Sequence, residues 1–382
     1  MEQNMLGAYG DWADGLLPKG PAELSFRRAS FTDLKTWQEE ARAKATELLC
    51  EPSMRGKIRA RVDKRYTYDK LDIEELSWQL PAGPRTRAVF LKPEGARGRL
   101  PAILALHDHG GRKYFGVRKI VRLPGRRHPL IAEHQRDHYD DKGWANEIAR
   151  RGFAVLVHDG FLFGSRRINY ADVPSRLAGG RRDKKSESTA EVLAYNQWAA
   201  DQEEVVAKSL FCAGTTWPGV FLAEDRKALD YLCGRADVDE GRVGCGGLSG
   251  GGLRTVFLAG TDPRIRAAIC MGFMSTWRDF LCYKSYTHTW MSFLPLAPRF
   301  FDFPEILGLR VPLPTLVQNC TEDPLYSLEG MQQADRILKV VYRKAGASDR
   351  YQGCFYPGGH KFDGSMQEDA YDWWARWLQE AD

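Results

Sequence analysis

The strongest constraint on the fold is a regular alternation between compact apolar runs and helical patterns. Six such runs follow one another toward the C-terminus: PAILALHDHGG, RGFAVLVHDG, GRVGCGG, IRAAICMGF, PTLVQNCTEDP and YQGCFYPGGH. Runs of this kind are typical of strands that are buried on both faces of a parallel sheet. Helical patterns such as GWANEIARRG and VFLAEDRKALDYLCG lie between them. The sequence therefore predicts a doubly wound, mostly parallel α/β sheet with helices on both faces.

Two further segments precede these runs and alternate polar with apolar residues, which is typical of strands near a sheet edge. They are YTYDKLDIEELSWQL and TRAVFLKPEG. Together with the six buried runs they give an expected sheet of eight strands. The last helix is expected to begin at a capping box formed by Ser365 and Glu368.

The first sixty residues differ from the rest of the chain. Between Phe31 and Cys50, apolar residues recur at helical spacing, at Leu34, Trp37, Ala41, Ala45 and Leu48. We therefore expect an N-terminal helical arm over residues 1–62, packed on one main domain over residues 63–382.

Charge and hydropathy exclude several classes of protein. The formal net charge is +5, which is too small in a chain of 382 residues to indicate a nucleic-acid binder. The stretch MEQNMLGAYGDWADGLLPKG lacks the basic start and apolar run of a secretory signal, and no segment reaches eighteen consecutive apolar residues. We therefore expect a cytoplasmic protein that binds neither nucleic acid nor a membrane, and the sequence leaves a homo-oligomer open.

Cysteine and histidine spacings give little support for a metal site. The eight cysteines contain no CxxC pair, so they are expected to be reduced thiols. His134 and His138 would share one face of a helix, and His107-Asp108-His109 is a second histidine-rich segment, but neither has a third ligand at a recognisable spacing. We expect a solvated polar segment around His134, and we assign no metal and no cofactor.

A single serine lies among glycines in the stretch RVGCGGLSGGGLRT, residues 242–255. Gly247-Leu248-Ser249-Gly250-Gly251 fits the pattern G-x-S-x-G, and it follows an apolar run and precedes a helical pattern. A sharp strand-to-helix turn would hold the serine in a strained conformation, and larger side chains beside it would collide with the strand and the helix. The turn would present the hydroxyl at a helix N-terminus, where backbone amides can meet a developing oxyanion.

On these residues the sequence resembles the α/β-hydrolase superfamily from about Arg65 to the C-terminus. Within it the sequence is similar to the carboxylesterases grouped with dienelactone hydrolases and acetyl xylan esterases. Serine, acid and histidine follow one another in that superfamily, and here Asp323 in QNCTEDPLY follows the seventh expected strand and His360 in YPGGHKFDG the eighth. The resemblance implies a catalytic triad of Ser249, Asp323 and His360.

The acid of this triad has two alternatives. Glu322 is adjacent to Asp323 in the sequence. Asp279, in STWRDF, follows the sixth expected strand, which is an alternative acid position in some relatives.

The loop LHDHGGRK resembles the His-Gly-Gly loop that supplies an oxyanion amide in such enzymes. The amide of Gly250 is the expected first donor, and His109 or Gly110 is the expected second. Asp108 stands where a glycine is common, which leaves the second donor open. His107 is expected to brace the loop by hydrogen bonds rather than to take part in catalysis.

The triad and the oxyanion amides together predict ester hydrolysis through an acyl-enzyme, with the histidine as base and the aspartate holding its imidazole. We expect a small-molecule or carbohydrate ester as the substrate, such as an acetyl or uronate ester. A serine peptidase and a lactone or C–C bond hydrolase of the same fold are alternatives. A non-catalytic binding protein with this fold is an alternative of another class.

Two insertions, at about residues 112–142 and 161–217, leave the expected sheet at the carboxyl ends of strands, where this fold builds its pocket. We expect them to form walls or a lid, and we assign substrate binding to Arg112 and Trp217 at their ends. Residues 112–142 carry nine Lys or Arg against four acids. Arginines that roof a pocket would favour an anionic substrate, and the alternative is that these bases are solvated or pair with a neighbouring subunit.

Overall fold

One mixed sheet of nine strands organises the computed structural model, which describes residues 4–184 and 186–380. Strands β5, β4, β6, β7, β8 and β9 run parallel, whereas β1, β2, β3 and β5 pair antiparallel in turn. In spatial order the strands are β1 (Arg61–Tyr68), β2 (Leu71–Trp78), β3 (Thr86–Pro93), β5 (Ala154–His158), β4 (Leu100–Ala105), β6 (Val238–Leu248), β7 (Ile265–Met271), β8 (Thr315–Cys320) and β9 (Tyr351–Tyr356).

The expectation of eight strands is wrong by one, because the segment YTYDKLDIEELSWQL turns back on itself. It forms the hairpin of β1 and β2, in which Tyr68 pairs with Leu71. Asp69 and Lys70 make the two-residue turn with φ angles of 51° and 61°. Asp is common at the first position of such turns, but the second usually carries Gly, so Lys70 removes the usual sequence signal.

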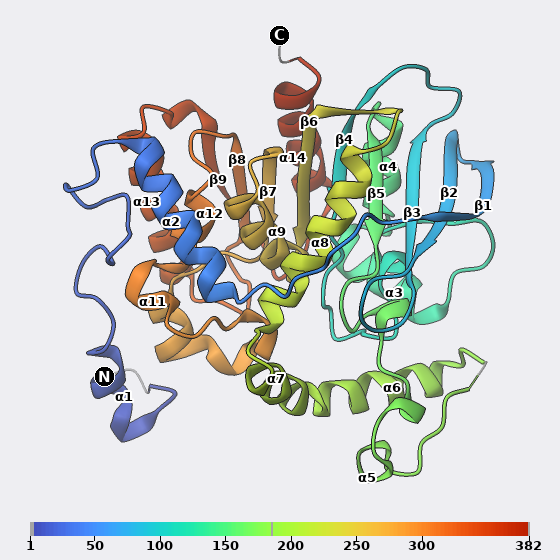
Figure 1. Cartoon of the computed structure of the whole chain (residues 1–382), viewed down its shortest axis with the longest axis horizontal. Coiled ribbons are helices and arrows are strands. Elements are labelled where there is room, and N and C mark those ends of the chain that lie inside the picture. The colour runs from blue at the N-terminus through green and yellow to red at the C-terminus, as the bar shows by residue number, and fades with distance from the viewer. Residues whose placement is uncertain (1–3, 185, 381–382) are drawn as a thin grey trace.

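Helices cover both faces of the sheet (Figure 1). One face packs against α2 (Leu34–Leu49), α8 (Trp217–Cys233), α9 (Gly250–Thr261), α12 (Phe303–Gly308) and α13 (Leu328–Lys344). The other face packs against α4 (Trp144–Arg150) and α14 (Gly364–Leu378). The N-cap of α14 is Asp363, whose carboxylate accepts the Met366 N–H, so the capping box expected at Ser365 is wrong. The Ser365 hydroxyl instead lies inside the first turn and donates to the Asp363 carboxylate at 2.8 Å.

The remaining elements are short or lie in the insertions. They are α1 (Gly10–Asp14), α3 (Pro129–Tyr139), α5 (Ser175–Ala178), α6 (Thr189–Asp201), α7 (Glu203–Cys212), α10 (Trp277–Asp279), α11 (Ala297–Phe300), the π-helical turn Phe280–Lys284 and the 3₁₀ turns Gly7–Tyr9, Val117–Lys119, Gly164–Arg166, Tyr170–Asp172, Ser285–Thr287, Trp290–Ser292 and Ser348–Arg350. No single helix in the described ranges has the length and apolar composition of a membrane span, although α7 and α8, bent by 84°, pass that test when they are joined.

The predicted N-terminal helix is α2, and its apolar stripe is buried at Trp37, Ala41, Ala45 and Leu48, whereas Leu34 at its start is half-buried. Asp33 caps it by accepting the Thr36 N–H at 2.7 Å. The side chains of Gln38 and Arg42 donate to the carbonyl oxygen of Leu309 at 2.9 and 3.0 Å. Helix α2 therefore joins the layer that contains α9.

The carboxyl edge of the parallel strands is the edge at which β6 ends and α9 begins. In Figure 1 this edge faces down, and α6 and α7 lie across it. Both helices belong to the expected insertion at 161–217. The insertion therefore covers the edge at which the sequence places its candidate site residues.

Candidate active site

Ser249 lies in the sharp turn between β6 and α9. Its backbone has φ 57° and ψ −120°, a conformation that is costly for any residue with a side chain. A hydrogen bond from its N–H to the carbonyl of Met271, at 2.9 Å, ties the turn to β7. A Cβ atom on Gly247 or Gly251 would overlap the carbonyl oxygen of Leu106. The glycines around Ser249 are therefore required by the close approach of β6, α9 and the end of β4.

The loop after β4 lies directly against the start of α9. A Cβ atom on Gly250 would lie 2.9 Å from the backbone nitrogen of His109. Of the two loop residues that the sequence offers as oxyanion donors, His109 is therefore the one whose amide nitrogen adjoins Gly250. Gly110 has φ 51°, which makes the turn that follows. Two backbone amides, one at a helix N-terminus, thus lie side by side next to the serine.

His360 and Asp323 are in direct contact. The Nδ1 atom of His360 lies 2.6 Å from Oδ2 of Asp323, so the imidazole donates its Nδ1–H to the carboxylate. The other carboxylate oxygen accepts the N–H of Leu325 at 3.0 Å, and the Asp323 side chain is only 1% exposed. In the described part of the chain the buried Nε2 atom of His360 has no hydrogen-bond partner. This tautomer leaves the Nε2 lone pair available to take a proton.

Gly272 brings this pair to the serine turn. It follows Met271, the residue that accepts the Ser249 N–H, and it has φ 56°. A Cβ atom at this position would lie 3.1 Å from Cε1 of His360 and 3.0 Å from a methyl of Leu248. His360 therefore lies beside the turn, although no hydrogen bond joins its ring to the Ser249 hydroxyl within residues 4–184 and 186–380. Such bonds are often loose in enzymes without substrate.

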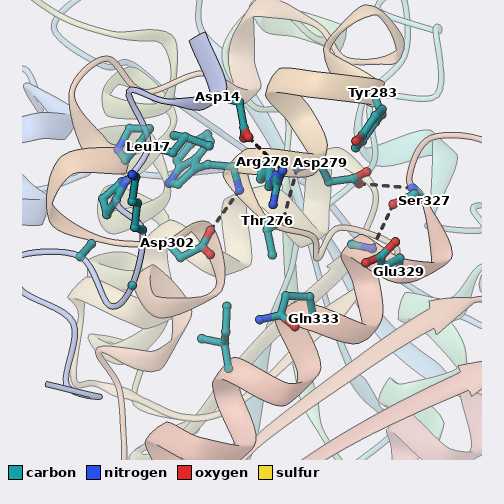
Figure 2. A pocket seen from close by; sticks show the side chains of 18 of the residues that line it. Asp14, Leu17, Thr276, Arg278, Asp279, Tyr283, Asp302, Ser327, Glu329 and Gln333 are labelled. Atoms are coloured by element: carbon teal, nitrogen blue, oxygen red, sulfur yellow. Dashed lines mark hydrogen bonds and ion pairs between the residues drawn. The ribbon is translucent and has the colours of Figure 1, made fainter. Parts of the chain in front are cut away.

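The two alternative acids lie elsewhere. Glu322 is exposed to solvent. Asp279 accepts the hydroxyl of Ser275 at 2.6 Å and the N–H of Ser327 at 3.2 Å, so it joins the loop after β7 to the start of α13. It lines a cavity of about 720 Å³, together with Glu329 of α13. Figure 2 shows these side chains. Asp323, and neither alternative, contacts His360.

The imidazoles of His109 and His107 are neutral, and hydrogen bonds hold both rings in place. His109 accepts the Gly111 N–H at Nδ1 and contacts Glu203 of α7 at 3.0 Å through Nε2. His107 contacts the carbonyl of Asp108 at 3.0 Å through Nδ1 and accepts the Gly160 N–H at Nε2. Burial lowers the pKa of both side chains, that of His107 well below its ordinary value. The bracing that the sequence predicts for His107 is thus present in the hydrogen bonds.

Asp108, which stands where a glycine is common, is buried in a polar cluster. Its carboxylate accepts the Tyr139 hydroxyl at 2.5 Å and lies 3.1 Å from Nε2 of His134. Burial raises the pKa of this carboxyl, but Lys119, His134 and the Tyr139 hydroxyl together outweigh burial and hold the pKa well below its usual range. The prediction of a solvated segment around His134 is therefore wrong, because this side chain of α3 is buried beside Asp108. The described residues contain no group of three or more His, Cys, Asp or Glu side chains that could hold a metal ion.

The two residues assigned to substrate binding are covered in this structure. Trp217 is 1% exposed and packs edge-on against Phe161, with the ammonium of Lys113 5.3 Å from its ring centre. Arg112 forms an ion pair with Glu133 at 2.8 Å. Their assignment stays a prediction.

Comparison with known proteins connects this geometry to hydrolases. No protein-family model matches the chain. A protein of Bacillus subtilis (strain 168) named "Putative hydrolase YtaP" is 26% identical over 309 residues, which cover 80% of this chain and 88% of that protein.

Solved structures resemble most of the chain. A "putative acetyl xylan esterase" of Bacteroides fragilis NCTC 9343 has a TM-score of 0.65 at 17% identity, covering 92% of this chain and 83% of its own. A glucuronoyl esterase of Solibacter usitatus has a TM-score of 0.64 at 15% identity, covering 94% of this chain and 98% of its own. The mixed sheet, the serine turn after β6 and these neighbours agree: the chain has the α/β-hydrolase fold that its sequence predicts.

Proposed function

We propose that the chain is a serine hydrolase that cleaves a carboxylic ester, on a carbohydrate or another small molecule, through an acyl-enzyme on Ser249. One observation carries the proposal: the strained Ser249 lies beside a half-buried His360 whose Nδ1–H is held by Asp323. The amides of Gly250 and His109 lie next to them. Sequence similarity to a hydrolase and structural similarity to carbohydrate esterases support it.

In the proposed reaction, Nε2 of His360 takes the proton from the Ser249 hydroxyl as its oxygen attacks the ester carbonyl carbon. Asp323 stabilises the imidazolium that forms, and the amides of Gly250 and His109 donate to the oxyanion. The imidazolium then gives its proton to the leaving alcohol. Water attacks the acyl-enzyme with the same base, which releases the acid and restores the serine.

Labelling with a fluorophosphonate probe and a substrate panel test this proposal. The panel contains p-nitrophenyl esters, acetylated sugars, methyl uronates, lactones and a peptide amide. We expect labelling of the wild type but not of Ser249→Ala, with turnover of the carbohydrate esters. A protein that is neither labelled nor active would be a non-catalytic binding protein, and preferred turnover of the amide or lactone would assign the alternative chemistry.

Gly272→Ala is expected to lower kcat for ester hydrolysis at least tenfold. The new methyl would press on the imidazole of His360, and the positive φ would cost about 1–3 kcal/mol of stability. Gly346→Ala is the matched control, because Gly346 has φ 68° with open space around it. Both variants should lose stability in thermal unfolding, but only Gly272→Ala should lose kcat. Equal losses of kcat in the two variants would contradict the placement of His360.

The basic insertion is largely neutralised within the chain. Asp108, Glu187 and Glu203, which lie outside residues 112–142, join the four acids inside it, so the local excess of bases falls from five (nine against four) to two (nine against seven). Eight of the nine bases form ion pairs: Arg112–Glu133, Lys113–Glu203, Arg118–Glu187, Lys119–Asp108, Arg122–Asp141, Arg127–Asp141, Arg136–Asp137 and Lys142–Asp140.

Bases that are paired within the chain attract an anionic substrate less strongly, so we do not expect the enzyme to select its substrate by negative charge. For matched anionic and neutral esters, the ratio of kcat/KM values is therefore expected to change by less than about twofold between low and high salt. The measurement is a salt series with both esters under identical conditions. A kcat/KM that falls steeply with salt for the anionic ester alone would instead show that the insertion steers anions.

A further inference from the structure

The loop after β4 contains a buried cation that the reaction scheme above does not use. Lys119, in the first insertion, is fully buried, and its ammonium donates to the carbonyl oxygens of Asp108 and, at 3.1 Å, His109. It lies 3.4 Å from Oδ2 of Asp108 and 4.7 Å from the ring centre of Phe163. Burying an ammonium is costly, so a site that keeps one needs a reason.

Peptide geometry gives that reason. The carbonyl of Asp108 and the N–H of His109 belong to one peptide group, which is planar and almost always trans, so they point in opposite directions. Lys119 binds the carbonyl end, and Nδ1 of His107 contacts the same oxygen at 3.0 Å. The nitrogen end adjoins Gly250. Two donors behind the peptide therefore direct its N–H toward the serine turn.

We propose that Lys119 is a positioning residue for the oxyanion site, because it fixes and polarises the Asp108–His109 peptide so that the His109 N–H donates to the developing oxyanion. A positive charge at the carbonyl end draws electron density away from the N–H, which strengthens it as a donor. This inference rests on the proposed function.

The same arrangement explains why an aspartate replaces the glycine that is common in such loops. The Asp108 carboxylate supplies the counter-charge that a buried ammonium requires. Its Oδ1 atom accepts the Tyr139 hydroxyl, and its Oδ2 atom lies near both Lys119 and Nε2 of His134. The segment after β4 thus contains both Lys119, whose ammonium orients the Asp108–His109 peptide, and the Asp108 carboxylate, which stabilises that ammonium.

Lys119 also faces His107 and His109 of the loop, Asp159 after β5 and Arg254 of α9. Burial lowers the pKa of Lys119 to about 8, and the charge of Asp108 limits that decrease. Because the pKa is lowered, a rising pH removes the ammonium charge in the folded protein before it would do so in an unfolded chain. Activity that depends on the charge is therefore present below about pH 8 and declines above it.

The test compares Lys119→Met with the wild type and with Arg310→Met. Arg310 is a matched control because it too is a fully buried cation that donates to backbone carbonyls, those of Pro314 and Ile265, at the amino ends of the strands. For p-nitrophenyl acetate we expect Lys119→Met to lower kcat ten- to hundredfold with little change in KM. Arg310→Met should lose thermal stability but keep kcat per folded molecule.

Two readouts separate positioning from general damage. Sulfur accepts hydrogen bonds weakly, so the rate ratio of p-nitrophenyl acetate to its thiono analogue should fall in Lys119→Met and stay constant in Arg310→Met. The alkaline decline of kcat near pH 8 should also disappear in Lys119→Met. If Lys119→Met does not fold, Lys119→Gln, which keeps an N–H donor without the charge, takes its place and should show a smaller change in the same direction.

An unchanged thiono ratio together with an unchanged pH profile would overturn the inference, whatever the loss in kcat. This outcome differs from failure of the proposed function, in which the wild type itself neither reacts with the fluorophosphonate nor hydrolyses an ester.

Discussion

Ser249→Ala is expected to abolish ester hydrolysis, with kcat lower by about a million-fold, because the residues of a triad act as one unit. The fold should be unaffected. Alanine keeps the Cβ atom, so the backbone at φ 57° and ψ −120° is strained to the same degree as with serine. Kinetic assays and thermal unfolding of the same preparation measure both effects.

Ser249→Gly provides the control for strain. Glycine adopts positive φ readily, so this variant should be as inactive as Ser249→Ala but more stable than the wild type by about 1 kcal/mol or more. Near-native activity in either variant would mean that the nucleophile is another residue, and the proposed function would fail with it.

Asp323→Asn is expected to lower kcat by about ten-thousand-fold while the protein stays folded. The Leu325 N–H, which Oδ1 of Asp323 now accepts, would take the amide oxygen of an asparagine. The amide NH₂ would then face Nδ1 of His360, which lies 2.6 Å from the present carboxylate. The imidazole would have to accept at Nδ1 and carry its proton on Nε2, so it could not take the proton of the serine.

Asp279→Asn is the matched comparison. Its amide oxygen can still accept from Ser275 and Ser327, so kcat should change less than tenfold. The measurement is kcat for both variants, with circular dichroism to show that each is folded. Greater damage from Asp279→Asn would move the acid to the loop after β7.

The parts of the site that the sequence predicts are those whose constraints are local. The glycines around Ser249 indicate that backbone segments come close together there, and in the structure the carbonyl of Leu106 lies against Gly247 and Gly251. Asp323 and His360 each follow an apolar strand, and parallel strands bring their carboxyl ends to one edge. Contact between these two side chains therefore follows from topology.

The parts that the sequence does not predict depend on partners that lie far along the chain. His134 looks solvated because its own segment is polar, but its partner Asp108 lies in another loop, and Tyr139 closes the same cluster. Nothing in the pattern around Lys119 distinguishes it from the other bases of residues 112–142. The hairpin at Asp69 is hidden in the sequence for a different reason, since Lys70 occupies the turn position that usually carries glycine.

The docking of α2 has a consequence for how the chain is made. Its apolar stripe packs in the layer of α9, and Gln38 and Arg42 donate to the carbonyl of Leu309. During translation α2 leaves the ribosome before α9 and Leu309, and at about 5–20 residues per second the roughly 260 residues up to that carbonyl take about 13–50 s. For that interval the stripe lacks the part of its docking surface that α9 and α12 supply, and Trp37 has local partners such as Phe26. The arm is thus synthesised well before the segments that complete its burial, so a nascent chain shields it fully only when most of the sheet exists.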